Sequence, residues 1–391
     1  MSKSKPYDLS RSLTALEQDT TLIAVIEMSH ASWLVAGLIP GVDRRALKKL
    51  EPDTAELCRL LDRWRQEAEH TGRVIRRITV AYEAGRDGFW LARWLQARGI
   101  EAWVIHPNSV AVSREHRRAK TDRLDTEHLM RAFLGWLRGE AEHCRMAAIP
   151  TLEEEDARRP NRERESLVED RTRLVSRMKA TLARFGIRTF KPTLRKAEER
   201  VAALQTAEGT PLPPLTVDEL RRDMTRLRLI REQIKAIETA RLRRLQQAAP
   251  DSGAHAMVHL LARIIGIGIE TADMLVNEAL SRRFRDQRAV ARYAGLTGAP
   301  DESGKQRREK GLARAGNARV RRGMIQLAWR LLMFQKESAL VHWYRARTAD
   351  GRGGTRKTMI VALARKLLIA LWRMVTTGEI PSGFVLRPAA S

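Results

Sequence analysis

The stretch TLIAVIEM occupies residues 21–28, and SWLVAGLI follows it at residues 32–39. Both runs are apolar and rich in β-branched residues, and a short polar turn joins them. This pattern is typical of a β-hairpin. Working outward, residues 74–82 and 100–105 read as two further strands. Helical spacing predicts helices at residues 53–68, 89–98 and 122–137.

Strand pairs followed by alternating helices and strands indicate an α/β domain with a mixed sheet, which we place at residues 1–148. Composition changes near Pro150, and residues 149–250 become rich in Arg, Glu and Leu. Two helical repeats of apolar residues there, separated by a Pro-rich break at 210–214, predict a helical hairpin or coiled coil. A solvated charged linker is the alternative for this segment.

Residues 251–391 are helical and basic, and we predict an α-helical C-terminal domain there. The stretch LARIIGIGIETADMLVNEAL at 261–280 reads as a helix, a turn with Gly266 and Gly268, and a second helix. This is the pattern of a helix–hairpin–helix, in which glycines let backbone N–H groups approach a phosphate. An ordinary tight turn between two core helices is the alternative.

Charge indicates the partner. The 391 residues include 72 Lys and Arg but 47 Asp and Glu, a formal net charge of +25. Such a surplus favours a polyanion, DNA or RNA, over a membrane surface. No apolar run is long enough to cross a bilayer, and the first twenty residues lack a signal-peptide core. Two cysteines without a CxxC pair are typical of a reducing cytoplasm, so we expect a cytoplasmic protein associated with the bacterial nucleoid.

Four acidic residues stand out in the predicted α/β domain. Glu27 and Glu83 each end a strand, where such folds place ligands, and Asp122 and Asp125 share one face of a helix. Gathered carboxylates repel one another unless a hard cation such as Mg²⁺ or Mn²⁺ binds them. Two such ions can serve phosphodiester chemistry. Taken singly, each glutamate could instead pair with an arginine, and each aspartate could simply favour a helix start.

Ser303 is the candidate nucleophile. It precedes a glycine and a run of cations that would offset charge developing on a phosphate. A serine hydroxyl is a weak nucleophile and needs a base or a metal beside it. The alternative for Ser303 is a plain turn residue. The alternative for the cations is a solvated basic face.

Four short motifs carry a resemblance to a known family: AKTDRLD at 119–125, YAGLT at 293–297, ESG at 302–304 and AGN at 315–317. With the order of the other segments, they resemble the DEDD transposases of the "IS-one-ten" insertion-sequence family, relatives of the Piv-type invertases. That resemblance implies an RNase H/RuvC-like domain, a coiled-coil hairpin and a C-terminal serine transposase domain.

The resemblance assigns metal binding to Glu27, Glu83, Asp122 and Asp125, and nucleophilic attack to Ser303. The family has aspartate where this chain has Glu27, and the added methylene can move a bound metal. The implied activity is cutting and rejoining of donor and target DNA through a transient phosphoserine. The implied partners are a structured noncoding (bridge) RNA and further copies of the chain, in a dimer or tetramer.

Nucleic acid is expected to contact eleven residues: Lys120, Arg123, Gly266, Gly268, Lys305, Arg307, Arg308, Arg314, Arg319, Arg321 and Arg322. Two other functions fit the same residues. One is a metal-dependent Holliday-junction nuclease that uses water in place of Ser303. The other is a non-catalytic nucleic-acid-binding protein descended from a transposase.

Overall fold

The computed structural model describes residues 9–83, 85, 88–110, 122–140, 143–248, 253–303, 306–312, 315–349 and 351–388. For residues 108, 122, 123, 299–303 and 306–310 it describes the backbone alone. The chain folds as two compact units, Met1–Glu153 and Glu154–Ser391. Within the described ranges, no helix has the length and hydropathy needed to span a bilayer.

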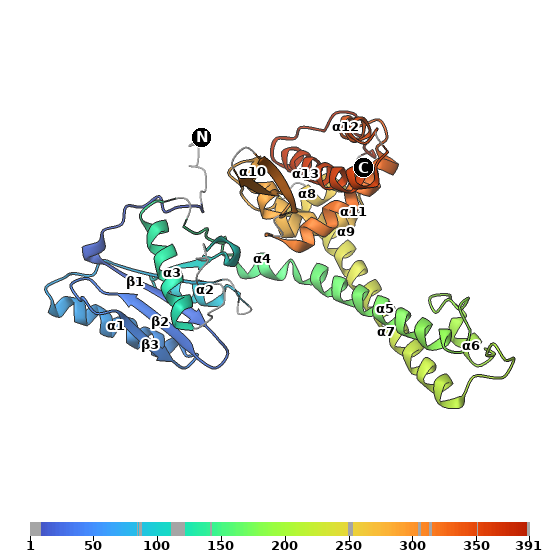
Figure 1. The fold of residues 1–391 in the computed structure, drawn as a ribbon, viewed down its shortest axis with the longest axis horizontal. Coiled ribbons are helices and arrows are strands. Elements are labelled where there is room, and N and C mark those ends of the chain that lie inside the picture. Colours follow the sequence, from blue (N-terminus) through green and yellow to red (C-terminus); the bar gives the residue numbers. More distant parts are fainter. Residues whose placement is uncertain are drawn as a thin grey trace. The chain divides into compact units, whose positions relative to one another are not determined.

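A five-stranded mixed sheet forms the centre of the first unit (Figure 1). Its strands lie in the order β3-β2-β1-β4-β5; β1–β2 and β2–β3 are antiparallel, whereas β4 runs parallel to both β1 and β5. The strands are β1 (Thr21–Met28), β2 (Trp33–Leu38), β3 (Ala46–Leu50), β4 (Arg77–Glu83) and β5 (Glu101–Ile105). The predicted hairpin is confirmed as β1–β2, and β3 is an addition to our prediction.

Helices cover both faces of this sheet (Figure 1). Alternation along β1 sends Leu22, Ala24 and Ile26 to the face covered by α1 (Thr54–His70). Ile23 and Val25 face α3 (Asp122–Leu137) and join its core. A third helix, α2 (Trp90–Gln96), packs with the α1 layer. All three helices match predicted segments, and this mixed sheet is consistent with an RNase H-like transposase domain.

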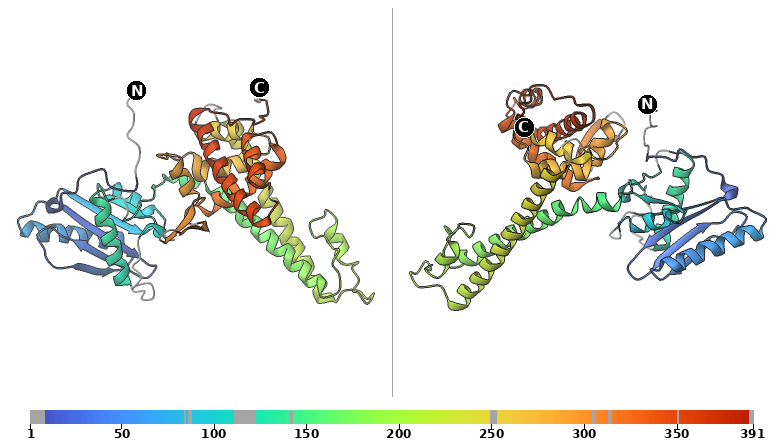
Figure 2. Two further views of the ribbon diagram at one scale, coloured as in Figure 1. Left: turned by 45° about the horizontal axis from the view of Figure 1, so that its top comes forward. Right: turned by 180° about the vertical axis from the view of Figure 1, so that it is seen from behind.

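The second unit contains two long helices, α5 (Arg159–Ala183) and α7 (Pro214–Gln247), which lie side by side (Figure 2). Ion pairs join Arg164 to Glu238 and Arg177 to Asp223, so the two helices run antiparallel. Their far end has its own apolar core, closed by α6 (Ala197–Val201). The predicted antiparallel helix pair is therefore confirmed. A short helix, α4 (Leu152–Asp156), precedes α5.

The C-terminal helices pack around a separate apolar core in this unit. They are α8 (Gly253–Ala262), α9 (Ile269–Leu275), a π-helical segment (Val276–Leu280), α10 (Gln287–Tyr293), α11 (Ala318–Phe334), α12 (Ala339–Arg347) and α13 (Gly353–Thr377). The helix pair and these helices belong to one unit. The division at 1–148, 149–250 and 251–391 stays a prediction.

The C-terminal region is not purely helical, contrary to our prediction. An antiparallel two-stranded sheet, β6 (Gly298–Ser303) with β7 (Gln306–Leu312), interrupts the helices. These strands carry almost no apolar alternation, because charged residues fill most of β7, and so the strand pattern was invisible in the sequence.

Candidate functional site

Two of the four predicted acids lie at the carboxyl ends of neighbouring parallel strands. Ile26 of β1 pairs with Tyr82 of β4, and Glu27 and Glu83 are the next residues on the two strands. Because side chains alternate along a strand, Glu27 falls on the same face as Ile23 and Val25. Glu83 likewise follows Ala81, which belongs to that same core. The register therefore puts both glutamates at one edge and one face of the sheet.

The other two acids begin the helix that covers this face. Asp122 is the first residue of α3, and Asp125 follows three positions later. Further along α3, Leu129 and Phe133 belong to the same apolar core as Val25, so the helix lies against the face that carries both glutamates. Hence the prediction that each glutamate ends a strand and that the aspartates share a helix agrees with the structure.

The described carboxylates at this edge of the sheet do not form a cluster of metal ligands. Among the described side chains, no group of three or more His, Cys, Asp or Glu residues is arranged to hold a metal ion. The side chain of Asp122 is outside this description. The donor set is nonetheless all carboxylate oxygen, which is the chemistry that Mg²⁺ and Mn²⁺ bind in proteins. The four acids therefore have the donor chemistry that a hard divalent cation requires, and two of them, Glu27 and Glu83, lie at strand ends.

A histidine lies close to the same sheet edge. His106 directly follows β5, whose Ile105 pairs with Glu83 of β4. Burial, followed by repulsion from Arg145, lowers the pKa of His106 below its ordinary value. The imidazole is therefore neutral at neutral pH and adds no positive charge beside the acids. His106 was not predicted from the sequence as a functional residue.

The predicted nucleophile lies in the second unit. Ser303 is the last residue of β6, and its backbone pairs with that of Gln306 at the start of β7. This places the serine at the tip of the β6–β7 hairpin. In the β6–β7 register, the backbone of Arg307 lies opposite that of Glu302, and the backbone of Arg308 lies opposite that of Asp301. Lys120, Lys305 and Arg314 lie outside the described residues.

The base of this hairpin is held by a tight contact between two chain segments. The Asn317 backbone N–H donates to the Tyr293 carbonyl at 2.6 Å. Gly316 has φ +96°, and a Cβ there would lie 2.5 Å from the Tyr293 carbonyl oxygen. A Cβ on Gly295 would lie 2.0 Å from the Ala315 carbonyl oxygen. The YAGLT and AGN motifs therefore meet as a clamp that closes the stem of the serine hairpin, and glycine is required on both sides.

A buried carboxylate anchors that clamp. Glu278, in the π-helical segment, is 1% exposed. It accepts from Arg162 of α5 at 2.9 and 3.3 Å and from the Asn317 side-chain amide at 2.9 Å. Burial alone would raise the pKa of Glu278, but these hydrogen bonds, together with the positive charges of Arg162 and Arg158, hold the pKa below its usual range. The Tyr293 hydroxyl also donates to the Glu278 carbonyl at 2.8 Å.

Glu278 and Arg162 were not predicted from the sequence. An acid inside the apolar run LVNEAL was the available signal, because a charge in such a run is either a surface residue or a paired buried one. Asn317, read only as part of a motif, caps α11 by accepting from the backbone of Arg319 and Val320.

Three of the predicted nucleic-acid contacts have partners within the second unit. Arg319 donates to Glu165 at 2.5 Å, and Arg322 also pairs with Glu165. Arg321 donates to the Ala315 carbonyl at 3.5 Å. The charges of Arg319 and Arg322 are thus partly balanced within the unit, which lowers the number of phosphates that these two arginines can neutralise.

The two turn glycines differ in their surroundings. Gly266 has φ +100°, and a Cβ there would lie 2.9 Å from the Phe334 side chain, so packing alone requires glycine. Gly268 has nothing within 4 Å of its Cβ position and directly precedes α9. Of the two, Gly268 is the one with open space for a ligand. Arg123 lies in the first turn of α3, with its backbone alone described.

Comparison with known proteins identifies relatives over almost the whole chain. A family described as "Transposase IS116/IS110/IS902 family" matches residues 258–342, and the DEDD transposase family of IS110 elements matches residues 42–187. A Sinorhizobium fredii protein described as transposase y4rJ is 42% identical over 96% of this chain and 97% of its own length. A family 20 transposase of Pseudomonas aeruginosa is 25% identical over 76% of this chain and 83% of its own length.

Proposed function

Because this chain belongs to the IS110 family of DEDD transposases, enzymes that act on DNA, we propose that it cuts and rejoins DNA with Ser303 as the nucleophile. The carboxylates of Glu27, Glu83, Asp122 and Asp125 supply the second half of the active site. The observation that supports the carboxylate half of the site is the position of Glu27 and Glu83 at adjacent parallel strand ends, on the face covered by α3.

The four carboxylates would hold a divalent cation, Mg²⁺ or Mn²⁺. When bound, such an ion supplies positive charge that polarises a phosphodiester and stabilises a leaving oxygen. Glu27 reaches one methylene further than an aspartate would. Because β1 and β4 are adjacent strands, the sheet sets the spacing between the Glu27 and Glu83 carboxylates.

The chemical step is a transesterification at phosphorus. The Ser303 hydroxyl loses its proton as its oxygen bonds to the phosphorus, and the bond from phosphorus to the 3′-oxygen breaks. The 3′-oxygen takes up a proton and leaves as a hydroxyl, while the 5′-phosphate stays on the serine. Attack by the 3′-hydroxyl of another strand reverses the step and rejoins DNA without net hydrolysis. Cations near the hairpin tip offset the charge of the transition state.

Several further properties belong to the same proposal. A structured noncoding RNA would guide the enzyme to donor and target DNA, and the net charge of +25 supports a polyanionic partner of this kind. The antiparallel pair α5–α7 would act as a coiled coil, and α8, Gly268 and α9 as a helix–hairpin–helix on DNA. The active form would be a dimer or tetramer, working in the cytoplasm at the nucleoid.

The test is covalent capture of DNA by the full-length protein. Wild-type protein should form a denaturant-resistant DNA adduct, and Ser303→Ala should reduce it to background. Ser281→Ala is the matched control, because Ser281 is an exposed serine at the end of the π-helical segment. If Ser303→Ala still cleaves DNA, the chain is a hydrolytic nuclease and the serine assignment is wrong.

RNA guidance has its own test. RNA that co-purifies with the protein should be enriched in one structured sequence, with regions complementary to the DNA it recombines. Heterogeneous cellular RNA in its place would contradict guidance while leaving the serine chemistry unaffected.

A further inference from the structure

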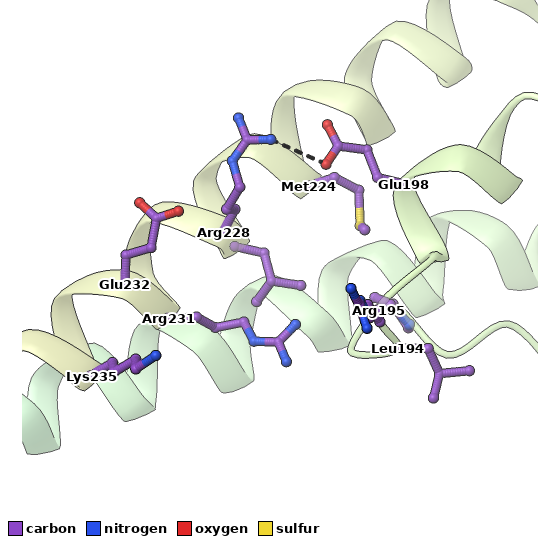
Figure 3. Close-up of a pocket in the computed structure, with 10 residues that line it drawn as sticks. Leu194, Arg195, Glu198, Met224, Arg228, Arg231, Glu232 and Lys235 are labelled. Carbon is purple, nitrogen blue, oxygen red and sulfur yellow. Dashed lines mark hydrogen bonds and ion pairs between the residues drawn. The ribbon is translucent and has the colours of Figure 1, made fainter.

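A cavity of about 250 Å³ lies at the far end of the helix pair, between α7 and the segment that leads into α6 (Figure 3). Its floor is apolar, formed by Met224 and Leu227, which belong to the small core at this end of the pair. Neither the predicted carboxylate site nor the serine hairpin includes any residue of this cavity.

The rim of the cavity is cationic. Arg228, Arg231 and Lys235 of α7 and Arg195 of the facing segment line it, with two carboxylates, Glu198 and Glu232. All four cations are exposed. Figure 3 shows the Arg231 side chain extending from α7 toward the segment that carries Arg195. The rim therefore presents more positive than negative charge to a ligand that enters from solvent.

The existing partners of these cations are weak enough to be replaced. Arg228 pairs with Glu198 at 3.4 Å, and both side chains are exposed, so the pair contributes on the order of 0–1 kcal/mol. Arg231 donates to the Thr193 carbonyl at 3.2 Å. Among the described residues, Arg195 and Lys235 form no ion pair. An incoming anion would thus displace little that stabilises the fold.

The spacing of the cations suits an extended polyanion. Arg228, Arg231 and Lys235 recur at intervals of three and four residues, which keeps them on one helical face. Seven residues of helix span about 10 Å. Successive phosphates of one DNA strand advance by about 3.4 Å along the duplex axis. The row of cations is therefore about as long as the distance that three successive phosphates advance along the duplex axis. It is longer than a single small anion needs.

We propose that this rim, Arg195, Arg228, Arg231 and Lys235, binds the phosphodiester backbone of nucleic acid at the end of the α5–α7 helix pair. The proposal rests on the proposed function in taking nucleic acid as the ligand. It adds a contact in the helix pair, for which the sequence predicted a helical hairpin or coiled coil and no contact with nucleic acid. Phosphate recognition of this kind is independent of base sequence.

The experiment compares full-length wild-type protein with Arg231→Gln/Lys235→Gln. Binding to a 30-base-pair DNA duplex and to a structured RNA hairpin is measured from about 50 to 300 mM salt. The double variant should bind about tenfold more weakly at 100 mM salt, and its salt slope should fall by about two. Arg243→Gln/Arg244→Gln removes the same charge from exposed positions further along α7 and should change both quantities less.

The outcomes separate the possible ligands. A loss confined to RNA identifies RNA as the polyanion on this rim, and a loss confined to the duplex identifies DNA. Equal effects of the two double variants on both ligands would overturn the proposal. So would a change in oligomeric state, measured by sedimentation, without a change in affinity, because the rim would then contact another copy of the chain. Covalent capture by Ser303 is measured with the rim intact, so failure here leaves that test standing.

Discussion

The side-chain amide of Asn317 donates to the buried carboxylate of Glu278 at 2.9 Å. The same asparagine caps α11 through its side-chain oxygen, so one residue serves a helix N-terminus and a buried charge at once. Since Glu278 also accepts from Arg162 of α5, this contact links the stem of the serine hairpin to the long helix pair.

Replacing Asn317 should separate its two roles. Asn317→Ser keeps a capping oxygen but loses the donor to Glu278, and we expect a loss of about 1–2 kcal/mol in unfolding free energy. Asn317→Ala loses the cap as well, for a total of about 2–3 kcal/mol. Urea midpoints of the full-length protein measure both. Equal losses in the two variants would mean that the cap contributes nothing, and wild-type stability of Asn317→Ser would mean that the Glu278 contact contributes nothing.

Removing Arg162 should change how stability depends on pH. The pKa of Glu278 is below its usual value in the folded protein, so its stabilisation is present above the unfolded value of about 4.3 and is lost as pH falls through the folded value. Arg162→Met leaves the carboxylate buried without its ion pair, at a cost of about 2–3 kcal/mol at pH 7, less than for a fully buried pair.

In the Arg162→Met variant, protonation of Glu278 should relieve the uncompensated charge. The stability gap between variant and wild type should therefore narrow as pH falls from 7 toward 4, measured by urea unfolding at each pH. A gap that stays constant over this range would show that the ion pair is not the source of the lowered pKa.

Gly316 should be intolerant of a side chain. Gly316→Ala adds a methyl group 2.5 Å from the Tyr293 carbonyl oxygen in a left-handed conformation, and we expect at least about 2–3 kcal/mol of destabilisation. Gly311→Ala is the matched control, because Gly311 also has a positive φ, +70°, but nothing within 4 Å of its Cβ position. It should cost about 1 kcal/mol. Equal thermal shifts would argue against the clamp.

Asp125 should be needed for DNA cleavage and Glu127 should not. Asp125→Asn removes one proposed metal ligand and should lower cleavage by at least about 100-fold, because metal-ion catalysis supplies several kcal/mol. Glu127 lies on the same helix and pairs with Arg45 at 3.2 Å, so Glu127→Gln should retain cleavage to within about threefold. Magnesium-dependent cleavage of labelled DNA measures both. Full activity of Asp125→Asn would exclude Asp125 from the site.

Much of the first unit could be predicted from the sequence because its elements are locally encoded. The apolar, β-branched run at Thr21–Met28 needs no partner to be recognised as a strand. The strand β3 was missed because its sequence, ALKKL, buries only its first residue fully and has no alternation. Glu27 and Glu83 were found because each acid ends an apolar strand.

Contacts between residues that are far apart in the chain could not be predicted from the sequence. Arg162 and Glu278 are 116 residues apart, and only the packing of α5 on the C-terminal helices brings them together. For the same reason, Arg319 and Arg322 looked like free cations, whereas both pair with Glu165 of α5. Local patterns report which residues are charged, and packing decides which charges are already balanced.

The π-helical segment Val276–Leu280 has a consequence for how this chain could vary. A π turn holds one residue more than an α turn, so deleting a single residue there would let the helix relax to the ordinary form. The parts of the chain on either side of the turn would keep their places, but the side chains within it would shift by up to one position, about 100° about the helix axis. Glu278 lies within this turn and would lose its alignment with Arg162 and Asn317. An in-frame loss of one codon would then uncouple the serine hairpin from the long helices while Arg162, Glu278 and Asn317 all remain in the sequence.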